Sequence, residues 1–322
     1  MSCLGRAPPA ELCRALTCAG VCQYTVPDFR AAREAFDDCY LKTAMADQMT
    51  VTPAANTLAA PPGAGTLTLL LNPFVVILIY LGEILTLLAQ AVKALRGGVD
   101  TRDLLEQMTS LGVNSVAIAL LTTTTSGAVL ALYFAPFLQQ YGAEGFTGAV
   151  VALAIARELG PVLTGVVVAA RAGSAIAAEL GTMKVTEQVD ALRALAVSPI
   201  QYLVVPRILA AAVMVPLVCA LADAGGILGG SLMSRSEGVQ SVVYWNSMKQ
   251  FIDLSDFTRG ILKTLVFGLI IVLVGCHQGL ATRGGATEVG KATTNAVVLS
   301  IILIYLANFV MTYFMFSGVK SF

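Results

Sequence analysis

Residues 156–207 read ARELGPVLTGVVVAARAGSAIAAELGTMKVTEQVDALRALAVSPIQYLVVPR, and this stretch decides the fold. Its first half is apolar enough to cross a bilayer, yet it contains Arg157, Glu158, Arg171 and Glu179. An ionised side chain near the bilayer centre costs roughly 2.5–3.5 kcal/mol on insertion scales, so such groups usually face a cavity, a partner or water. These four residues are therefore candidate site residues within a membrane-spanning segment.

Two features of this stretch predict how it packs. Pro161 has no amide hydrogen to give the carbonyl group of Arg157, four residues earlier, so we expect a kink and a carbonyl oxygen available to another donor. Small residues also recur at every fourth position, a spacing that lets another helix approach closely. They are Ala169, Gly173, Ala177 and Gly181, and in a later apolar segment Gly226 and Gly230.

The second half of the stretch has a different character. Over residues 183–196, charged and polar residues alternate with apolar ones in the manner of a short amphipathic helix, which we expect to stop near Ser198 and Pro199. Such a helix lies outside the membrane. It can contact a partner protein or rest on lipid headgroups alone, and amphipathicity fits both interpretations.

The composition sets the class of protein. The chain has 322 residues, of which 57% are hydrophobic and 12% are charged, and its mean hydropathy is +0.78. Soluble domains carry about 25% charged residues, so we expect a polytopic membrane protein. The formal net charge is zero, which gives no bulk attraction to nucleic acid, and we expect no nucleic-acid partner.

The amino-terminal residues differ from the rest of the chain. Residues 1–66 contain no apolar stretch followed by a cleavage site, and the tract 50–66 has the prolines and glycines of a flexible linker. We expect residues 1–66 to be an extension that is disordered or partly a targeting segment. Five of the seven cysteines lie in it, but without paired C-x-x-C spacings and with His277 as the only histidine they predict no metal site.

The remaining residues contain five apolar stretches long enough to be full spans. They cover approximately residues 113–139, 148–178, 199–234, 257–280 and 293–316. An apolar but interrupted stretch over residues 67–95 precedes them, followed by a short helix over 100–111 that we expect to rest at the interface. Asp100 or Thr101 is the expected cap of that short helix.

One motif near the last apolar stretch is similar to a nucleotide-binding loop. Residues 285–291 read GATEVGK, which has the spacing of a phosphate-binding loop, but Ala292 stands where that loop needs Ser or Thr to hold magnesium. We therefore expect no ATP binding, and interpret the glycines as a short turn with Thr293 or Thr294 capping the last helix. The absence of H-E-x-x-H and G-x-S-x-G motifs gives hydrolase or metal chemistry little support, so we expect no catalytic site and no cofactor.

Several strings in this order carry a resemblance: RELGPV, ARAGSA, AELGTMKVTEQVDAL, AVSP, PR and GGATEVGKATT. Together they resemble the MlaE/YrbE family, the permease subunits of ABC-type lipid transporters that work with MCE-domain proteins, including the plastid trigalactosyldiacylglycerol lipid permease. The resemblance runs from about residue 75 to the carboxyl end. It implies an all-α permease domain over residues 67–322, with an amino-terminal membrane elbow helix, five transmembrane helices and a cytoplasmic coupling helix between the second and third spans.

The resemblance also implies two sets of site residues. Four charged residues resemble the positions that line the family's lipid cavity, near the axis of a homodimer. They are Arg157, Glu158, Asp256 and Lys263. An anionic headgroup needs a cation in an otherwise apolar pocket, and arginine suits phosphate through its bidentate fork. The alternative interpretation is that these charges only pair with each other and hold helices together.

The second set concerns energy supply. In ABC permeases the coupling helix docks on an ATPase subunit at the cytoplasmic side, and the matching positions here are Glu187, Gln188, Asp190 and Leu192. The implied partners are a second copy of the chain, the ATPase, an MCE-domain protein on the opposite side and phospholipid as the substrate. The implied location is a bacterial inner membrane or a plastid inner envelope.

Two alternatives from other functional classes remain open at this point. An ion- or proton-coupled secondary transporter could use Glu158, Glu179 and Asp223 as a relay, and would be expected to show internal repeats, none of which is visible in the spans. A scaffold that binds partners without moving lipid is the other alternative. Lipid transfer by a reconstituted complex would discriminate among the three.

Overall fold

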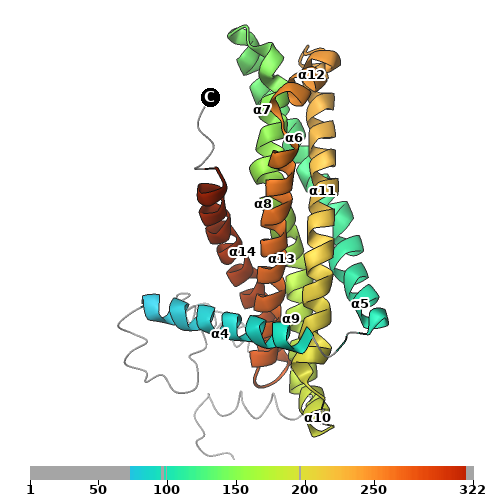
Figure 1. The fold of residues 1–322 in the computed structure, drawn as a ribbon, viewed down its shortest axis with the longest axis vertical. Helices are drawn as coiled ribbons and strands as arrows, with labels where there is room; N and C mark the ends of the chain where they lie inside the picture. The colour runs from blue at the N-terminus through green and yellow to red at the C-terminus, as the bar shows by residue number, and fades with distance from the viewer. Residues whose placement is uncertain (1–72, 96–97, 99, 196, 317–322) are drawn as a thin grey trace, which may run out of the picture. The chain divides into compact units, whose positions relative to one another are not determined.

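The computed structural model of the protein describes residues 73–95, 98, 100–195 and 197–316, and every regular element in that part is a helix (Figure 1). The α-helices are α4 (Pro73–Ala94), α5 (Thr101–Met108), α6 (Asn114–Gln140), α7 (Thr147–Ala154), α8 (Gly160–Val168), α9 (Ser174–Val185), α10 (Gln188–Ala194), α11 (Val205–Ser236), α12 (Ser241–Phe251), α13 (Leu254–Ala281) and α14 (Ala286–Phe316). The residues expected to form the amino-terminal extension, 1–66, lie outside the described part.

Five stretches are long and apolar enough to cross a membrane, which confirms the predicted polytopic all-α membrane protein. They are Thr101–Gln140, Glu144–Val185, Ile200–Ser236, Leu254–Ala281 and Ala286–Met315. Figure 1 shows α10 and the turn before α14 at one end of the bundle, and α12 with the turn before α7 at the other. The five spans therefore place α10 and the carboxyl-terminal end of α14 at opposite ends of the bundle.

The first span is longer than the hydropathy pattern predicts. The expected short helix over 100–111 is not separate, because α5 continues through a π-helical turn, η3 (Thr109–Val113), into α6. Gly112 does not end the helix, since a helical glycine costs only about 1 kcal/mol relative to alanine and this one packs against the side chain of Met214. Asp100 is the amino-terminal cap, and its side chain accepts from the amide of Arg102 at 3.0 Å.

The last span also starts earlier than predicted. α14 begins at Ala286, so most of the run 285–291 forms its first turns, and the expected cap at Thr293 or Thr294 is wrong. Both hydroxyls instead donate to the carbonyl oxygen of Gly290, inside the helix. Gly284, with a φ of 115°, makes the turn between α13 and α14, because that backbone conformation is open to glycine and strained for other residues.

The helix α4 crosses the ends of the other helices instead of running along them (Figure 1). Polar contacts attach it to α13: the Glu83 carboxylate lies 3.0 Å from the His277 ring, and Gln278 donates to the Tyr80 hydroxyl at 3.2 Å. Since His277 and Gln278 are adjacent near the end of α13, this end of the bundle is fixed to the helix that precedes the first span.

Glycines bring two pairs of spans into backbone contact. A Cβ atom at Gly127 of α6 would lie 2.1 Å from the carbonyl oxygen of Gly226 on α11, and one at Gly230 of α11 would lie 3.4 Å from the carbonyl oxygen of Gly127. On the other side, a Cβ atom at Gly275 of α13 would lie 3.1 Å from the carbonyl oxygen of Gly173. Close approach of this kind replaces hydrophobic burial as the main source of helix association within a bilayer.

Candidate functional site

Arg157 and Glu158 lie on a π-helical turn, η5 (Ile155–Leu159), which joins α7 to α8. The amide of Gly160 bonds to the carbonyl of Ile155, five residues back, and Pro161 at the start of α8 has no amide hydrogen to donate. The carbonyl oxygen of Arg157 instead accepts from the Lys263 ammonium at 2.9 Å. Such π turns are rare and occur often at functional sites.

The helix α13 supplies the opposite side of the site. Asp256, Gly260 and Lys263 are spaced by four and three residues, so they share one face of the helix. A Cβ atom at Gly260 would lie 2.2 Å from the carbonyl oxygen of Ala156, which shows that α13 touches the backbone of the π turn directly. This contact lets the side chains of Asp256 and Lys263 reach the turn from either side.

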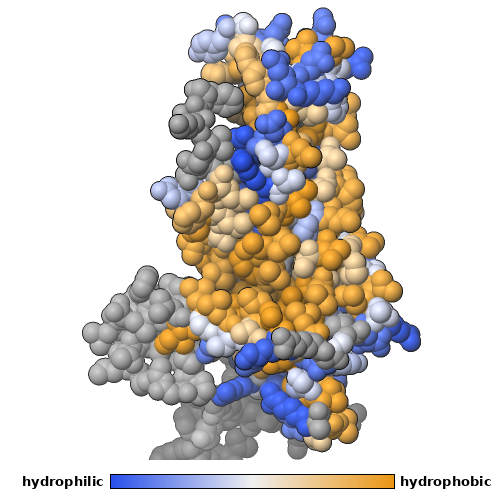
Figure 2. All heavy atoms as spheres, in the orientation of Figure 1, coloured by the Kyte–Doolittle hydropathy of each residue, from blue (hydrophilic) through white to orange (hydrophobic). Residues whose placement is uncertain are grey.

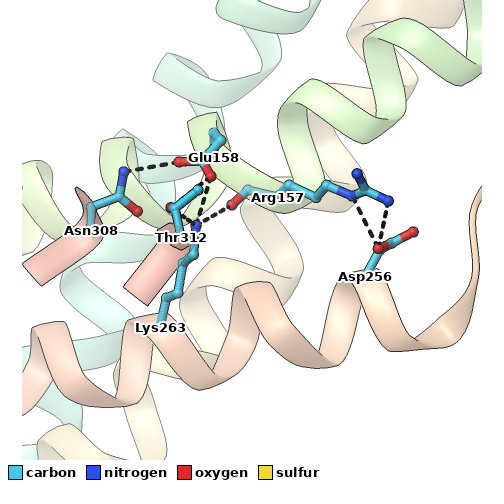
Figure 3. Close-up of polar contacts among 6 residues, drawn as sticks. All are labelled: Arg157, Glu158, Asp256, Lys263, Asn308 and Thr312. Atoms are coloured by element: carbon cyan, nitrogen blue, oxygen red, sulfur yellow. Dashed lines mark hydrogen bonds and ion pairs between the residues drawn. The ribbon is translucent and has the colours of Figure 1, made fainter. Parts of the chain in front are cut away.

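The four charged side chains predicted from the sequence come together in two ion pairs (Figure 3). The Nε and Nη2 atoms of Arg157 lie 3.0 and 2.9 Å from Oδ1 of Asp256. Nζ of Lys263 lies 2.8 Å from Oε1 of Glu158. The side chains of Lys263 and Asp256 are 0% and 4% exposed, whereas those of Arg157 and Glu158 are 30% and 39% exposed. The site therefore has a buried side on α13 and an open side on the π turn.

Two residues of α14 complete the network, and neither was among the predicted site residues. Asn308 donates to Oε2 of Glu158 at 2.9 Å, and the Thr312 hydroxyl donates to Oε1 at 2.9 Å (Figure 3). Lys263 in turn donates to the Thr312 hydroxyl oxygen at 2.8 Å. A sequence pattern could have predicted both residues, because they continue a row of positions spaced by four along one face of α14. That face carries Ala292, Ala296, Ser300, Ile304, Asn308 and Thr312.

Figure 2 shows hydrophilic side chains interrupting the apolar surface beside the carboxyl-terminal end of α14. Large apolar side chains of α14 near this level, Phe309 and Tyr313 among them, are exposed on the single chain. A cavity of about 210 Å³ lies at the other end of the bundle, where Asp100, Asp103 and Tyr202 contribute to its wall. The charged network therefore opens on the surface of the single chain, away from that cavity.

The amphipathic segment between the second and third spans contains α10. Glu187, directly before it, has a φ of 61° and a ψ of 10°, a left-handed conformation that costs a non-glycine residue about 1–2 kcal/mol. Glu187, Gln188 and Asp190 are exposed, Leu192 is partly buried, and Val189 is buried against the bundle. The segment is thus anchored by one face and presents the other, with a strained residue at its start.

An exposed ion-pair cluster holds the shape of this segment. The Asp190 carboxylate lies 2.8 Å from Lys184 and 3.0 Å from Arg193. The hydrogen bond from Lys184 is the main cause that lowers the pKa of Asp190 below its ordinary value. At the base of the same loop, Arg207 of α11 pairs with Glu179 of α9 at 2.8 Å.

The family described as "Permease MlaE" matches residues 104–314, which include the π turn, the network and α10. The chain belongs to the MlaE permease family. A protein of Synechocystis named "Probable ABC transporter permease protein" is 45% identical over 225 residues, covering 70% of this chain and 86% of that protein. A protein of Rickettsia typhi with the same description is 43% identical over 214 residues, covering 66% and 83%.

A plant protein is also similar to this MlaE permease. "Protein TRIGALACTOSYLDIACYLGLYCEROL 1, chloroplastic" of Arabidopsis thaliana is 38% identical over 228 residues, covering 70% of this chain and 65% of that protein. The resemblance to the MlaE family noted in the sequence is thereby confirmed, as is an integral membrane location.

A secondary transporter was the alternative that would use three carboxylates as a relay. In this MlaE permease those three carboxylates have different neighbours. Glu158 contacts Lys263, Glu179 contacts Arg207, and Asp223 is buried with Oδ2 3.6 Å from the thiol of Cys219. A Cβ atom at Gly160 would lie 1.6 Å from Oδ1 of Asp223, so this carboxyl group occupies the space that the glycine leaves.

Proposed function

We propose that the chain is the permease subunit of an ABC transporter that moves phospholipid or a related lipid, driven by a separate ATPase subunit and working with an MCE-domain protein. The observation that carries this proposal is the network of two cations and two anions that opens on an otherwise apolar surface within the spans. Ionised groups at such a depth are expensive and usually serve a polar ligand or partner.

The chemistry of the network suits a phospholipid headgroup. Arg157 is the more open of the two cations, and the planar fork of donors that binds Asp256 also matches phosphate geometry. The exposed apolar side chains of α14 beside it would contact acyl chains, which need no polar partner. A molecule with an anionic head and apolar tails therefore matches both parts of this surface.

A second copy of the chain would turn this surface into a chamber. In the most apolar window of α14, 11% of the residues are buried, compared with 61% in that of α13, so much of the surface of α14 is uncovered in the single chain. The network lies next to that uncovered helix. We propose that the homodimer contact covers it, so that the lipid site is enclosed between two copies.

The energy source would act at the opposite end. Residues 187–192 lie at the same end of the bundle as the turn between α13 and α14. The ion pair between Glu179 and Arg207 links α9 to α11, the helices on either side of the segment that contains α10. A push on α10 by an ATPase would thus reach α9 and α11 together. The MCE-domain protein would bind at the end that carries α12, in a bacterial inner membrane or a plastid inner envelope.

The test compares two double variants of the purified complex. Arg157→Ala with Lys263→Ala should lower the amount of phospholipid that copurifies and is cross-linked in the complex, measured by mass spectrometry. Lys93→Ala with Arg102→Ala removes the same charge from exposed positions outside the network and outside both proposed partner surfaces, and should leave lipid unchanged. Equal lipid occupancy in both variants would return the four network charges to a purely structural role.

A further inference from the structure

The Glu158 carboxylate occupies a small anion-binding site formed by the chain itself. Oε1 accepts from Lys263 at 2.8 Å and from Thr312 at 2.9 Å, and Oε2 accepts from Asn308 at 2.9 Å. The three donors come from two helices, α13 and α14, while the carboxylate comes from the π turn (Figure 3). A cation and two neutral donors around two oxygens are the kind of site that also binds a phosphate group.

The Lys263 ammonium is fully engaged in this state. An ammonium group has three donor hydrogens, and Lys263 donates to the Arg157 carbonyl, the Glu158 carboxylate and the Thr312 hydroxyl. A lipid phosphate can therefore bind Lys263 only by replacing one of them. The Arg157 carbonyl belongs to the backbone of the π turn, so the exchangeable acceptor is the side chain of Glu158.

Exposure shows which partner can leave. Glu158 is 39% exposed on a flexible side chain, whereas Lys263 is 0% exposed and cannot follow it into another environment. Leaving a buried cation without an anion is strongly unfavourable. Departure of Glu158 is therefore favourable only when another anion takes its position, which makes the exchange conditional on the ligand.

We propose that Glu158 is an internal substitute for the anionic headgroup, and that Asn308 and Thr312 are headgroup-binding residues. On lipid entry the phosphate takes over the donors of Lys263, Thr312 and Asn308, and the Glu158 carboxylate moves to the open side. This inference rests on the proposed lipid function and adds to it two residues and a competition. It also explains why the buried face of α14, apolar or small from Ala292 to Ile304, becomes polar at its last two positions.

The central experiment is Glu158→Gln, which keeps the size and the acceptor oxygen but removes the competing charge. Binding of phosphatidylglycerol to the purified complex in detergent should become about tenfold tighter, the effect of one lost charge-assisted contact. Binding of diacylglycerol with the same acyl chains should not change. Asn308→Asp adds a second anion beside the first and should weaken phosphatidylglycerol binding.

Thr312→Val keeps the shape of the side chain and removes its hydroxyl, so it tests the donor set without disturbing the charges. It should weaken phosphatidylglycerol binding and leave diacylglycerol binding as it is; no change would overturn the assignment of Thr312. Weaker or unchanged phosphatidylglycerol binding by Glu158→Gln would overturn the competition, while the wild-type preference for phosphatidylglycerol over diacylglycerol would still support the proposed function. If the wild-type complex binds phosphatidylglycerol no more tightly than diacylglycerol, the proposed function itself is contradicted.

Discussion

Gly127→Ala tests whether the α6–α11 contact is as close as the structure shows. The added Cβ atom would lie 2.1 Å from the carbonyl oxygen of Gly226, and that oxygen belongs to the backbone, so no side chain can rotate away. Overpacking of this kind costs about 1–3 kcal/mol, and the rigid obstacle places it near the upper end. Alanine recovers about 0.5–1 kcal/mol of helix stability over glycine. The expected net loss in the free energy of unfolding is about 2 kcal/mol.

Gly290→Ala is the matched control, because it makes the same change inside α14 where the added Cβ meets nothing within 4 Å beyond the adjoining backbone of its own helix. It should raise the free energy of unfolding by about 0.5–1 kcal/mol. Both variants can be unfolded in mixed micelles by raising the fraction of denaturing detergent, with the single Trp245 as a fluorescence probe. If Gly127→Ala is no less stable than Gly290→Ala, the two helices are not in backbone contact and the packing argument is refuted.

Further variants test the segment that contains α10 and the charged network. Glu187→Lys should abolish copurification of the ATPase without loss of membrane insertion, whereas Glu144→Lys at the opposite end should not; retention of the ATPase by the first variant contradicts the coupling role. Because the hydrogen bond from Lys184 lowers the pKa of Asp190, that contribution to α10 is present above the unfolded-state pKa of about 3.9 and is lost as pH falls through the lower folded-state value. Corrected hydrogen-exchange protection of α10 should therefore be constant from about pH 8 to 5 and fall below about pH 4, and Asp190→Asn should remove this dependence. Gly260→Ala should push α13 off the π turn, lower the free energy of unfolding by about 2 kcal/mol and reduce bound lipid with all four charges still present; normal lipid content would show that the backbone contact does not position the network.

The cost of burying charge identified two of the four charged residues of the network. Arg157 and Glu158 stand out because ionised groups are rare in an apolar stretch, and the resemblance to the family added Asp256 and Lys263. The pairing itself depends on Gly260, whose role is visible only when the backbone of α13 is seen against the π turn. No pattern within one helix predicts that contact.

Asn308 and Thr312 escaped prediction for another reason. Both are neutral, and a single Asn or Thr in an apolar helix is ordinarily interpreted as a hydroxyl or amide that satisfies its own backbone. Their contacts with Glu158 depend on the orientation of α14, which packs Ala296 and Ile304 inward and so points the next two positions of the same face at that carboxylate. A search for stripes at a spacing of four would have placed them on the buried face.

Helix boundaries were predicted less well than helix positions. The short helix was expected to end at residue 111 and the glycines of residues 285–291 to form a turn, yet α5 continues into α6 and α14 begins at Ala286. In water such residues often end a helix, because the backbone can bond to solvent instead. Within a bilayer each unsatisfied amide or carbonyl costs several kcal/mol, so the helix continues through residues that would otherwise stop it.

The π turns have a consequence for variation in chain length. In the described part of the chain they lie at Thr109–Val113, Ile155–Leu159, Ala169–Gly173 and Ile200–Val204, and each accommodates one residue more than an α-helical turn. A deletion within one of them converts it to an ordinary turn and keeps the flanking helices in phase. The same deletion in the middle of α6 would rotate half of that helix by about 100° and turn its glycine away from α11. Single-residue gaps between relatives are therefore expected to gather at these four turns.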